Sequence, residues 1–166
     1  FTSDGAQVVA AEDRTGQMRV YETATGRIVS EAIVAAEQAV ALSPDGKFAV
    51  YLGKADLPSG RGYHVFEVES GRRVGTLPIP NATQRRSVFS PDGKWLCLLT
   101  TAAGGRTTQA FLVQTETWMP VAVGVCKTGD RTGRASKPQF SPDSHLLVVP
   151  TDGSHLVAFD ITVPPK

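Results

Sequence analysis

One tight turn occurs four times along the chain, and no other sequence feature limits the fold so strongly. The copies are FTSDG at 1–5, LSPDG at 42–46, FSPDG at 89–93 and FSPDS at 140–144. Counted from Ser3, Ser43, Ser90 and Ser141, the intervals are 40, 47 and 51 residues. A fixed motif at a drifting interval indicates one structural unit repeated, with connecting loops of variable length.

The chemistry of this turn predicts a hairpin. Proline at the second position presets φ, and aspartate and glycine then supply the polar positions that tolerate a left-handed backbone. The first copy lacks the proline, and Ser144 replaces the glycine in the last copy. We expect both copies to keep the turn. We also expect the four turn aspartates to bond their own turn backbone rather than bind calcium; they are Asp4, Asp45, Asp92 and Asp143.

Each unit contains short runs that predict strands. After the turn come AQVVAA, KFAVYL, KWLCLL and HLLVV; after a polar or glycine-rich loop come the alternating runs QMRVYET, YHVFEVE, TQAFLVQ and HLVAFDI. Three units add a second turn and a fourth run: RIVSEAI, RRVGTLPI and WMPVAVGV. None of these runs has a helical period. We interpret even the helix-prone stretch 32–40 as strand, loop and strand.

Four antiparallel strands in each repeated unit are typical of a β-propeller blade. The pattern resembles the WD-repeat (WD40-like) propeller superfamily, particularly its degenerate bacterial members. The resemblance rests on the four turns and on Tyr21-Glu22, Phe66-Glu67 and Phe159-Asp160, which stand where that superfamily has Trp-Asp. No third strand has a true Trp-Asp, and no Gly-His dipeptide precedes a unit. The superfamily's buried polar network is therefore expected to be absent, which leaves apolar packing as the main stabiliser.

The sequence predicts an all-β fold, a WD-like propeller or propeller fragment, as one segment over 1–166. Its blade units are approximately 1–38, 39–80, 81–126 and 127–166. The first unit begins at the end of its inner strand and the last stops after its third strand, so we expect about four blades with both terminal blades incomplete. The preferred interpretation is a segment of a longer parent chain. The alternative is that copies of the chain associate to close a ring.

Function is expected on the long, variable loops, which the predicted topology places on one face. The candidate partner-binding residues are Arg61, Arg85, Arg86, Arg106, Trp118, Lys127, Arg131, Arg134 and Lys137. The resemblance implies a non-catalytic scaffold that binds a protein partner or the remaining blades of its parent chain. A polyanion-binding surface is the weaker alternative, because no aromatic residues interleave with the basic ones.

Signatures of catalysis and of cofactor or metal binding are missing from the sequence. The histidines His64, His145 and His155 are not in metal-ligand spacing, and we interpret them as strand residues. We therefore expect no enzyme, cofactor or metal, the alternative being an enzyme whose catalytic residues lie outside this segment. The net charge of +1 and the lack of a long apolar run argue against nucleic acid and membrane partners. Cys97 is expected to be buried in an apolar strand, and no disulfide framework indicates a compartment.

Overall fold

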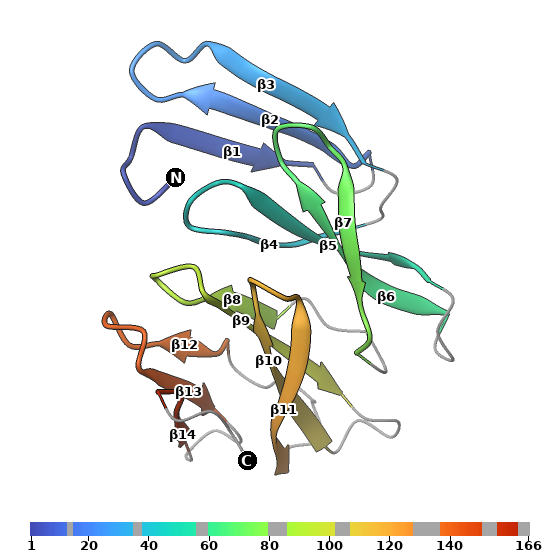
Figure 1. Ribbon diagram of the computed structural model, residues 1–166, viewed down its shortest axis with the longest axis vertical. Coiled ribbons are helices and arrows are strands. Elements are labelled where there is room, and N and C mark those ends of the chain that lie inside the picture. Colours follow the sequence, from blue (N-terminus) through green and yellow to red (C-terminus); the bar gives the residue numbers. More distant parts are fainter. Residues whose placement is uncertain are drawn as a thin grey trace. The chain divides into compact units, whose positions relative to one another are not determined.

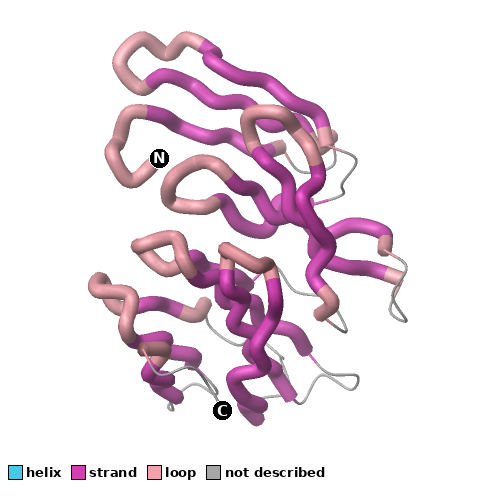
Figure 2. Tube along the Cα trace, viewed as in Figure 1, coloured by secondary structure: helices cyan, strands magenta, loops and turns pink. Residues whose placement is uncertain are grey.

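The structure is a computed structural model, and it describes residues 1–12, 15–34, 38–55, 60–79, 86–101, 107–127, 137–150 and 156–162. In these ranges all regular secondary structure is β-strand, arranged in four antiparallel sheets (Figures 1 and 2). The chain divides into two compact units, Phe1–Pro78 and Ile79–Lys166, with two sheets in each. The all-β prediction is confirmed.

The strands follow one another across each sheet in chain order. The first sheet contains β1 (Gln7–Ala11), β2 (Gln17–Glu22) and β3 (Ile28–Ile33). The second contains β4 (Gln38–Leu42), β5 (Phe48–Lys54), β6 (Arg61–Glu67) and β7 (Arg73–Leu77). The third contains β8 (Arg86–Phe89), β9 (Trp95–Thr101), β10 (Thr107–Gln114) and β11 (Met119–Lys127). The fourth contains β12 (Gln139–Phe140), β13 (Leu146–Pro150) and β14 (Leu156–Asp160).

Each unit has its own hydrophobic core between its two sheets. In the first unit, side chains of β2 and Val34 pack against those of β5, β6 and Val68. The buried members are Met18, Val20, Val34, Ala49, Tyr51, Phe66 and Val68. Tyr51 and Phe66 meet edge to face, with ring centroids 5.8 Å apart, a favoured geometry for aromatic pairs. Alternation along β5 and β6 thus sends every second side chain into this core.

The second core lies between the third and fourth sheets. Its buried members are Cys97, Leu99, Ala110, Leu112, Leu147, Val149 and Ile161, with Trp95, Phe140 and Phe159 packed against them. Cys97 is buried, as its apolar strand predicted. The aromatic residues Trp95, Phe140 and Phe159 serve the core between sheets, which the sequence also indicated.

The repeated turn is held by one hydroxyl and one carboxylate. The Ser43 hydroxyl donates to Asp45 Oδ1 at 2.6 Å and accepts the Phe48 N–H at 2.9 Å. The same carboxylate oxygen accepts the Lys47 N–H at 3.0 Å. Equivalent bonds hold the turns at 90–95 and 141–146. The prediction that these aspartates bond their own turn backbone is therefore confirmed.

The first copy of the turn corrects the assigned register of the repeat. Its hydroxyl comes from Thr2, which donates to Asp4 Oδ1 at 2.5 Å and accepts the Gln7 N–H at 3.1 Å. Counting from Ser3 was wrong by one residue, because a threonine hydroxyl can replace that of serine. Ser3 instead occupies the proline position. Unlike proline it has an N–H group, which donates to the Pro44 carbonyl of the second sheet's turn at 2.7 Å.

The last copy of the turn also departs from the pattern in a way that the structure explains. Ser144 has φ 63°, close to the 73° of Gly46 and the 72° of Gly93 at the same turn position. Its hydroxyl accepts the Asp92 N–H at 3.1 Å, in the turn of the third sheet. The side chain that strains the backbone therefore links two turns of the second unit.

A second turn joins the last two strands in each of the first three sheets. Gly26 and Gly71 adopt φ 70° and 67° there, and Trp118 stands at the equivalent place with φ 56°. The Trp118 N–H donates to the Gln114 carbonyl at 2.8 Å, as the Gly71 N–H does to Glu67 at 2.9 Å. Trp118 is half-buried. A bulky residue in the left-handed region is uncommon and costs conformational energy.

The strand ends differ from the predicted ones at several basic residues. Arg61 and Arg86, which we assigned to loops, are the first residues of β6 and β8, and Lys127 is the last residue of β11. His64 is the fourth residue of β6, within a strand as predicted. The reason for the difference at β6 is that the polar ends of β5 and β6 still pair, with Lys54 opposite Arg61.

Candidate functional site

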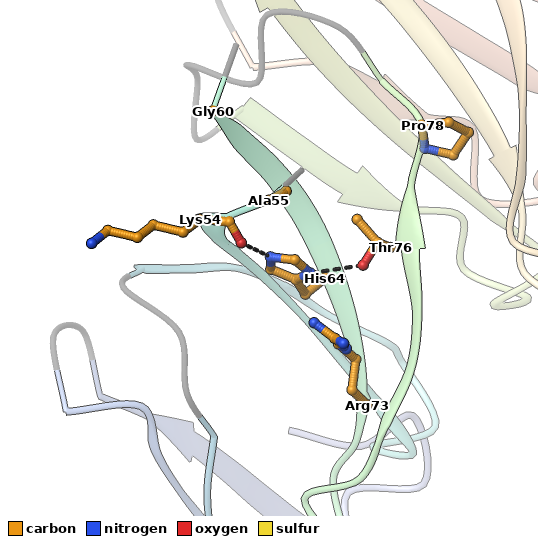
Figure 3. A pocket seen from close by; sticks show the side chains of 7 residues that line it. All are labelled: Lys54, Ala55, Gly60, His64, Arg73, Thr76 and Pro78. Atoms are coloured by element: carbon orange, nitrogen blue, oxygen red, sulfur yellow. Dashed lines mark hydrogen bonds between the residues drawn. The ribbon is translucent and has the colours of Figure 1, made fainter. Parts of the chain in front are cut away.

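A pocket of about 710 Å³ lies on the second sheet, at the end where β5 leads into β6 (Figure 3). Lys54 and Ala55 line it from the end of β5, and Gly60 from the start of β6. The rest of its wall is His64 on β6 with Arg73, Thr76 and Pro78 on or just after β7. This is the end of the sheet at which the sequence placed a long connecting loop.

His64 is fixed in the wall of the pocket by two hydrogen bonds. Its Nε2 lies 2.8 Å from the Lys54 carbonyl oxygen and its Nδ1 lies 2.9 Å from Thr76 Oγ1 (Figure 3). A carbonyl oxygen only accepts, so Nε2 carries a proton and donates to it, while Nδ1 is hydrogen-bonded to the threonine hydroxyl. Only 4% of His64 is exposed. Because both ring nitrogens are hydrogen-bonded, the ring holds Thr76 in place and offers no lone pair for catalysis.

Two of the described residues that line the pocket, Lys54 and Arg73, are basic. Among the described residues no carboxylate forms an ion pair with Lys54 or Arg73, whereas Arg19, Lys47, Arg72 and Lys94 each have an acidic partner. The lining residues that the structure describes include no aspartate or glutamate. Figure 3 shows the Arg73 guanidinium extending toward the His64 ring and the Lys54 side chain pointing away. The arrangement therefore suits an anionic group beside Arg73.

In the first sheet, the residue pair equivalent to His64 and Thr76 is an ion pair. Arg19 stands two residues before Tyr21, as His64 stands two residues before Phe66, and their cross-strand partners are Glu31 and Thr76. Arg19 and Glu31 form an ion pair at 3.3 Å, and the Glu31 charge raises the pKa of Arg19 above its ordinary value. Where the first sheet has its own carboxylate, the second therefore has the threonine hydroxyl and a pocket.

A second hollow of about 480 Å³ lies between the first and second sheets at the end that carries the repeated turns. Asp45 and Glu67 line it, but Asp45 pairs with Lys47 at 3.5 Å and Glu67 with Arg72 at 3.6 Å. Two of its three carboxylates are thus paired with basic neighbours, and the third is Glu69. It is therefore a weaker candidate for a binding site than the pocket lined by His64, Arg73 and Thr76, which is called the pocket on β7 below.

The predicted partner-binding residues are placed unevenly. Arg61 is half-buried at the start of β6, opposite Lys54 in the strand register. Arg86 is half-buried on β8, and Lys137 is exposed just before β12. Arg85, Arg106, Arg131 and Arg134 lie outside the described residues, as does the side chain of Lys127. The prediction that these residues bind a partner therefore stays a prediction.

The sequence interpretation missed Arg73 and Thr76 and treated His64 only as a strand residue. A usable signal was present in the alignment of the first two units on Tyr21-Glu22 and Phe66-Glu67. That alignment sets Arg19 against His64 and Glu31 against Thr76. It also sets the basic Arg73 against the apolar Ile28, so the second unit has an additional positive charge at this position.

The described residues contain no group of three or more His, Cys, Asp or Glu side chains arranged to hold a metal ion. They also contain no helix of the length and apolarity needed to cross a membrane.

Comparison with known proteins identifies the fold but not the function. No family model and no curated protein matches the sequence. The structure resembles the complex of KlAtg21 with the coiled-coil of AgAtg16, at TM-score 0.60 and 20% identity over 95% of this chain and 50% of that one. Atg21 is a WD propeller. The chain has an all-β, propeller-like fold.

A second propeller-containing structure, Kuenenia stuttgartiensis hydrazine synthase, matches at TM-score 0.50 and 14% identity, over 90% of this chain and 53% of that one. The propeller fold thus occurs in proteins of different function, and the likeness establishes architecture alone. The chain spans about half the length of the two structures that it matches.

Proposed function

We propose that this propeller segment is a non-catalytic interaction module of the WD-repeat type that binds a protein partner. Binding takes place at the end of the second sheet where β5 leads into β6. The observation that carries the proposal is the pocket on β7, in which Arg73 has no carboxylate partner among the described residues. By contrast, the hydroxyls and carboxylates of the repeated turns bond within those turns.

The likeness to Atg21 supports a protein partner, because that propeller was solved in complex with a coiled-coil. The enzyme alternative has less support. Hydrazine synthase is named as an enzyme, but the buried histidine of this chain has both ring nitrogens hydrogen-bonded. Binding residues often lie on loops positioned by a rigid scaffold. The pocket lies where two paired strands, β5 and β6, are connected.

The test is selection of a random peptide library, displayed on phage, against the immobilised 166-residue chain. We expect selected peptides that lose affinity with Lys54→Glu and keep it with Lys47→Glu. Both changes reverse one exposed lysine, but Lys47 lies at the opposite, turn-bearing end of the second sheet. Peptides that depend on Lys47 instead, or no enrichment at all, would contradict the proposed function.

A further inference from the structure

The charge in the pocket is concentrated on one guanidinium. Arg73 extends into it, while Lys54 contributes its carbonyl to His64 and directs its ammonium group outward (Figure 3). The Thr76 hydroxyl is already bonded to Nδ1 of His64 at 2.9 Å. The pocket thus offers one planar, forked cation, which matches the two oxygens of a carboxylate. A phosphate dianion would find a single positive charge there.

The first sheet shows the same position with a carboxylate present. Glu31 of β3 lies where Thr76 lies on β7, and it accepts hydrogen bonds from the Arg19 guanidinium at 3.3 Å. The fold therefore accommodates a glutamate side chain beside a basic residue at this register. In the second sheet that carboxylate has to come from outside the sheet.

The position of β7 favours an extended ligand. β7 is the last strand of the second sheet, and a terminal strand presents unpaired main-chain N–H and C=O groups along its outer edge. A peptide that lies along such an edge directs every second side chain to the same face of the sheet. An acidic residue at one of these places would reach Arg73.

We infer that the pocket on β7 binds one aspartate or glutamate side chain from an extended acidic segment of a protein partner. The inference rests on the proposed function and specifies its chemistry. Arg73 clamps the carboxylate. His64 holds Thr76 in place and closes the wall behind it. Lys54 also lines the pocket, with its ammonium group directed outward.

The first test measures binding of a defined peptide to the full 166-residue chain. The probe is a fluorescein-labelled, capped peptide of alternating glutamate and valine, followed by fluorescence anisotropy. Loss of a charge-assisted hydrogen bond predicts that Arg73→Gln weakens binding roughly 10- to 100-fold. Arg72→Gln is the matched control, because Arg72 is a neighbouring arginine that pairs with Glu67 outside the pocket. It should leave the affinity within about twofold.

A second variant places the carboxylate within the chain. Thr76→Glu places in the pocket, opposite His64, the acid that Glu31 supplies opposite Arg19 in the first sheet. A carboxylate already held in the pocket should abolish binding of the acidic peptide. The neutral variant Thr76→Gln removes the same hydroxyl without adding charge and should retain binding within a few-fold. Circular dichroism and the melting temperature confirm that both variants are folded.

Three results would overturn the inference. The first is equal loss of binding in Arg72→Gln and Arg73→Gln, and the second is unaltered binding in folded Thr76→Glu. The third is displacement of the peptide by oligothymidylate or inorganic phosphate, at matched ionic strength, more effectively than by unlabelled peptide. If the selected library peptides bind this end of the sheet but contain no acidic residue, the proposed function stands and the carboxylate site fails.

Discussion

Two glycines at the same turn position differ in what a methyl group would meet. A Cβ on Gly46 would lie 2.7 Å from Thr2 Cγ2, whereas a Cβ on Gly5 would have nothing within 4 Å. Both glycines have positive φ, 73° and 69°. Thr2 cannot rotate its methyl away cheaply, because its hydroxyl is bonded to Asp4 and Gln7. The first two sheets are therefore in close contact at this residue.

We expect Gly46→Ala to destabilise the chain more than Gly5→Ala. The control carries only the left-handed strain of an alanine, about 1 kcal/mol. Gly46→Ala adds overpacking against Thr2, which costs roughly a further 1–3 kcal/mol. The free energy of unfolding from urea titrations measures the difference. Equal values for the two variants would mean that the contact with Thr2 yields without cost.

Trp118 allows strain to be separated from side-chain contacts. The equivalent residues Gly26 and Gly71 adopt its left-handed conformation without penalty. We expect Trp118→Gly to be more stable than Trp118→Ala by about 1 kcal/mol, because both lose the indole but only glycine relieves the backbone. Thermal unfolding of the two variants checks this. An alanine variant at least as stable as the glycine variant would show that the turn relaxes.

At the scale of the element, each repeated turn depends on an ionised aspartate. Burial by itself would raise the pKa of Asp45 and of Asp92. The serine hydroxyl, the lysine N–H and the lysine charge outweigh that effect and lower both values below the ordinary range. A carboxyl whose pKa is lower in the folded chain stabilises it above the unfolded value, about 3.9, and that stability is lost as pH falls through the folded value.

We therefore expect the melting temperature to fall as the pH is lowered below about 4. Asp45→Asn with Asp92→Asn should lower it at pH 7 and flatten its acid dependence, because an amide does not titrate. Melting curves by circular dichroism between pH 7 and 2 measure both effects. If the double variant kept the full acid dependence, other carboxyls would have to be responsible.

The strands were predictable because their causes are local. Alternation sets the face of each side chain, and Pro-Asp-Gly sets the hairpin. The pocket was not predictable in that way, because it depends on which residue of β7 faces His64, and a bulge between Val65 and Phe66 shifts that register. The role of Thr2 was missed for a different reason. Serine and threonine supply the same hydroxyl, so the letter pattern misled where the chemistry was unchanged.

At the scale of the whole molecule, protection is uneven among the strands. Five consecutive residues of β5, Ala49 to Gly53, are buried, whereas four of the five residues of β14 are exposed. β5 lies inside a four-stranded sheet and β14 ends a three-stranded one. Local opening takes place most easily where few apolar contacts hold a strand.

We expect amide hydrogens of β5 to exchange at least about a hundredfold more slowly than those of β14. Native-state hydrogen–deuterium exchange with peptide-level mass spectrometry gives both rates in one experiment. The peptide covering Phe48–Lys54 is compared with the one covering Leu156–Asp160. Similar rates in the two peptides would indicate that the chain opens as a single cooperative body.

The two imperfect copies of the turn have a consequence for anyone who would regularise this repeat. Consensus design would write Ser-Pro-Asp-Gly in every blade, and so would replace Ser3 by proline and Ser144 by glycine. The first change deletes the N–H that reaches Pro44, and the second deletes the hydroxyl that receives the Asp92 N–H. The averaged sequence would make each turn more ideal and detach it from the turn beside it. In this protein the two residues that depart from the motif form hydrogen bonds to the turn of a neighbouring repeat, so one repeat cannot simply replace another.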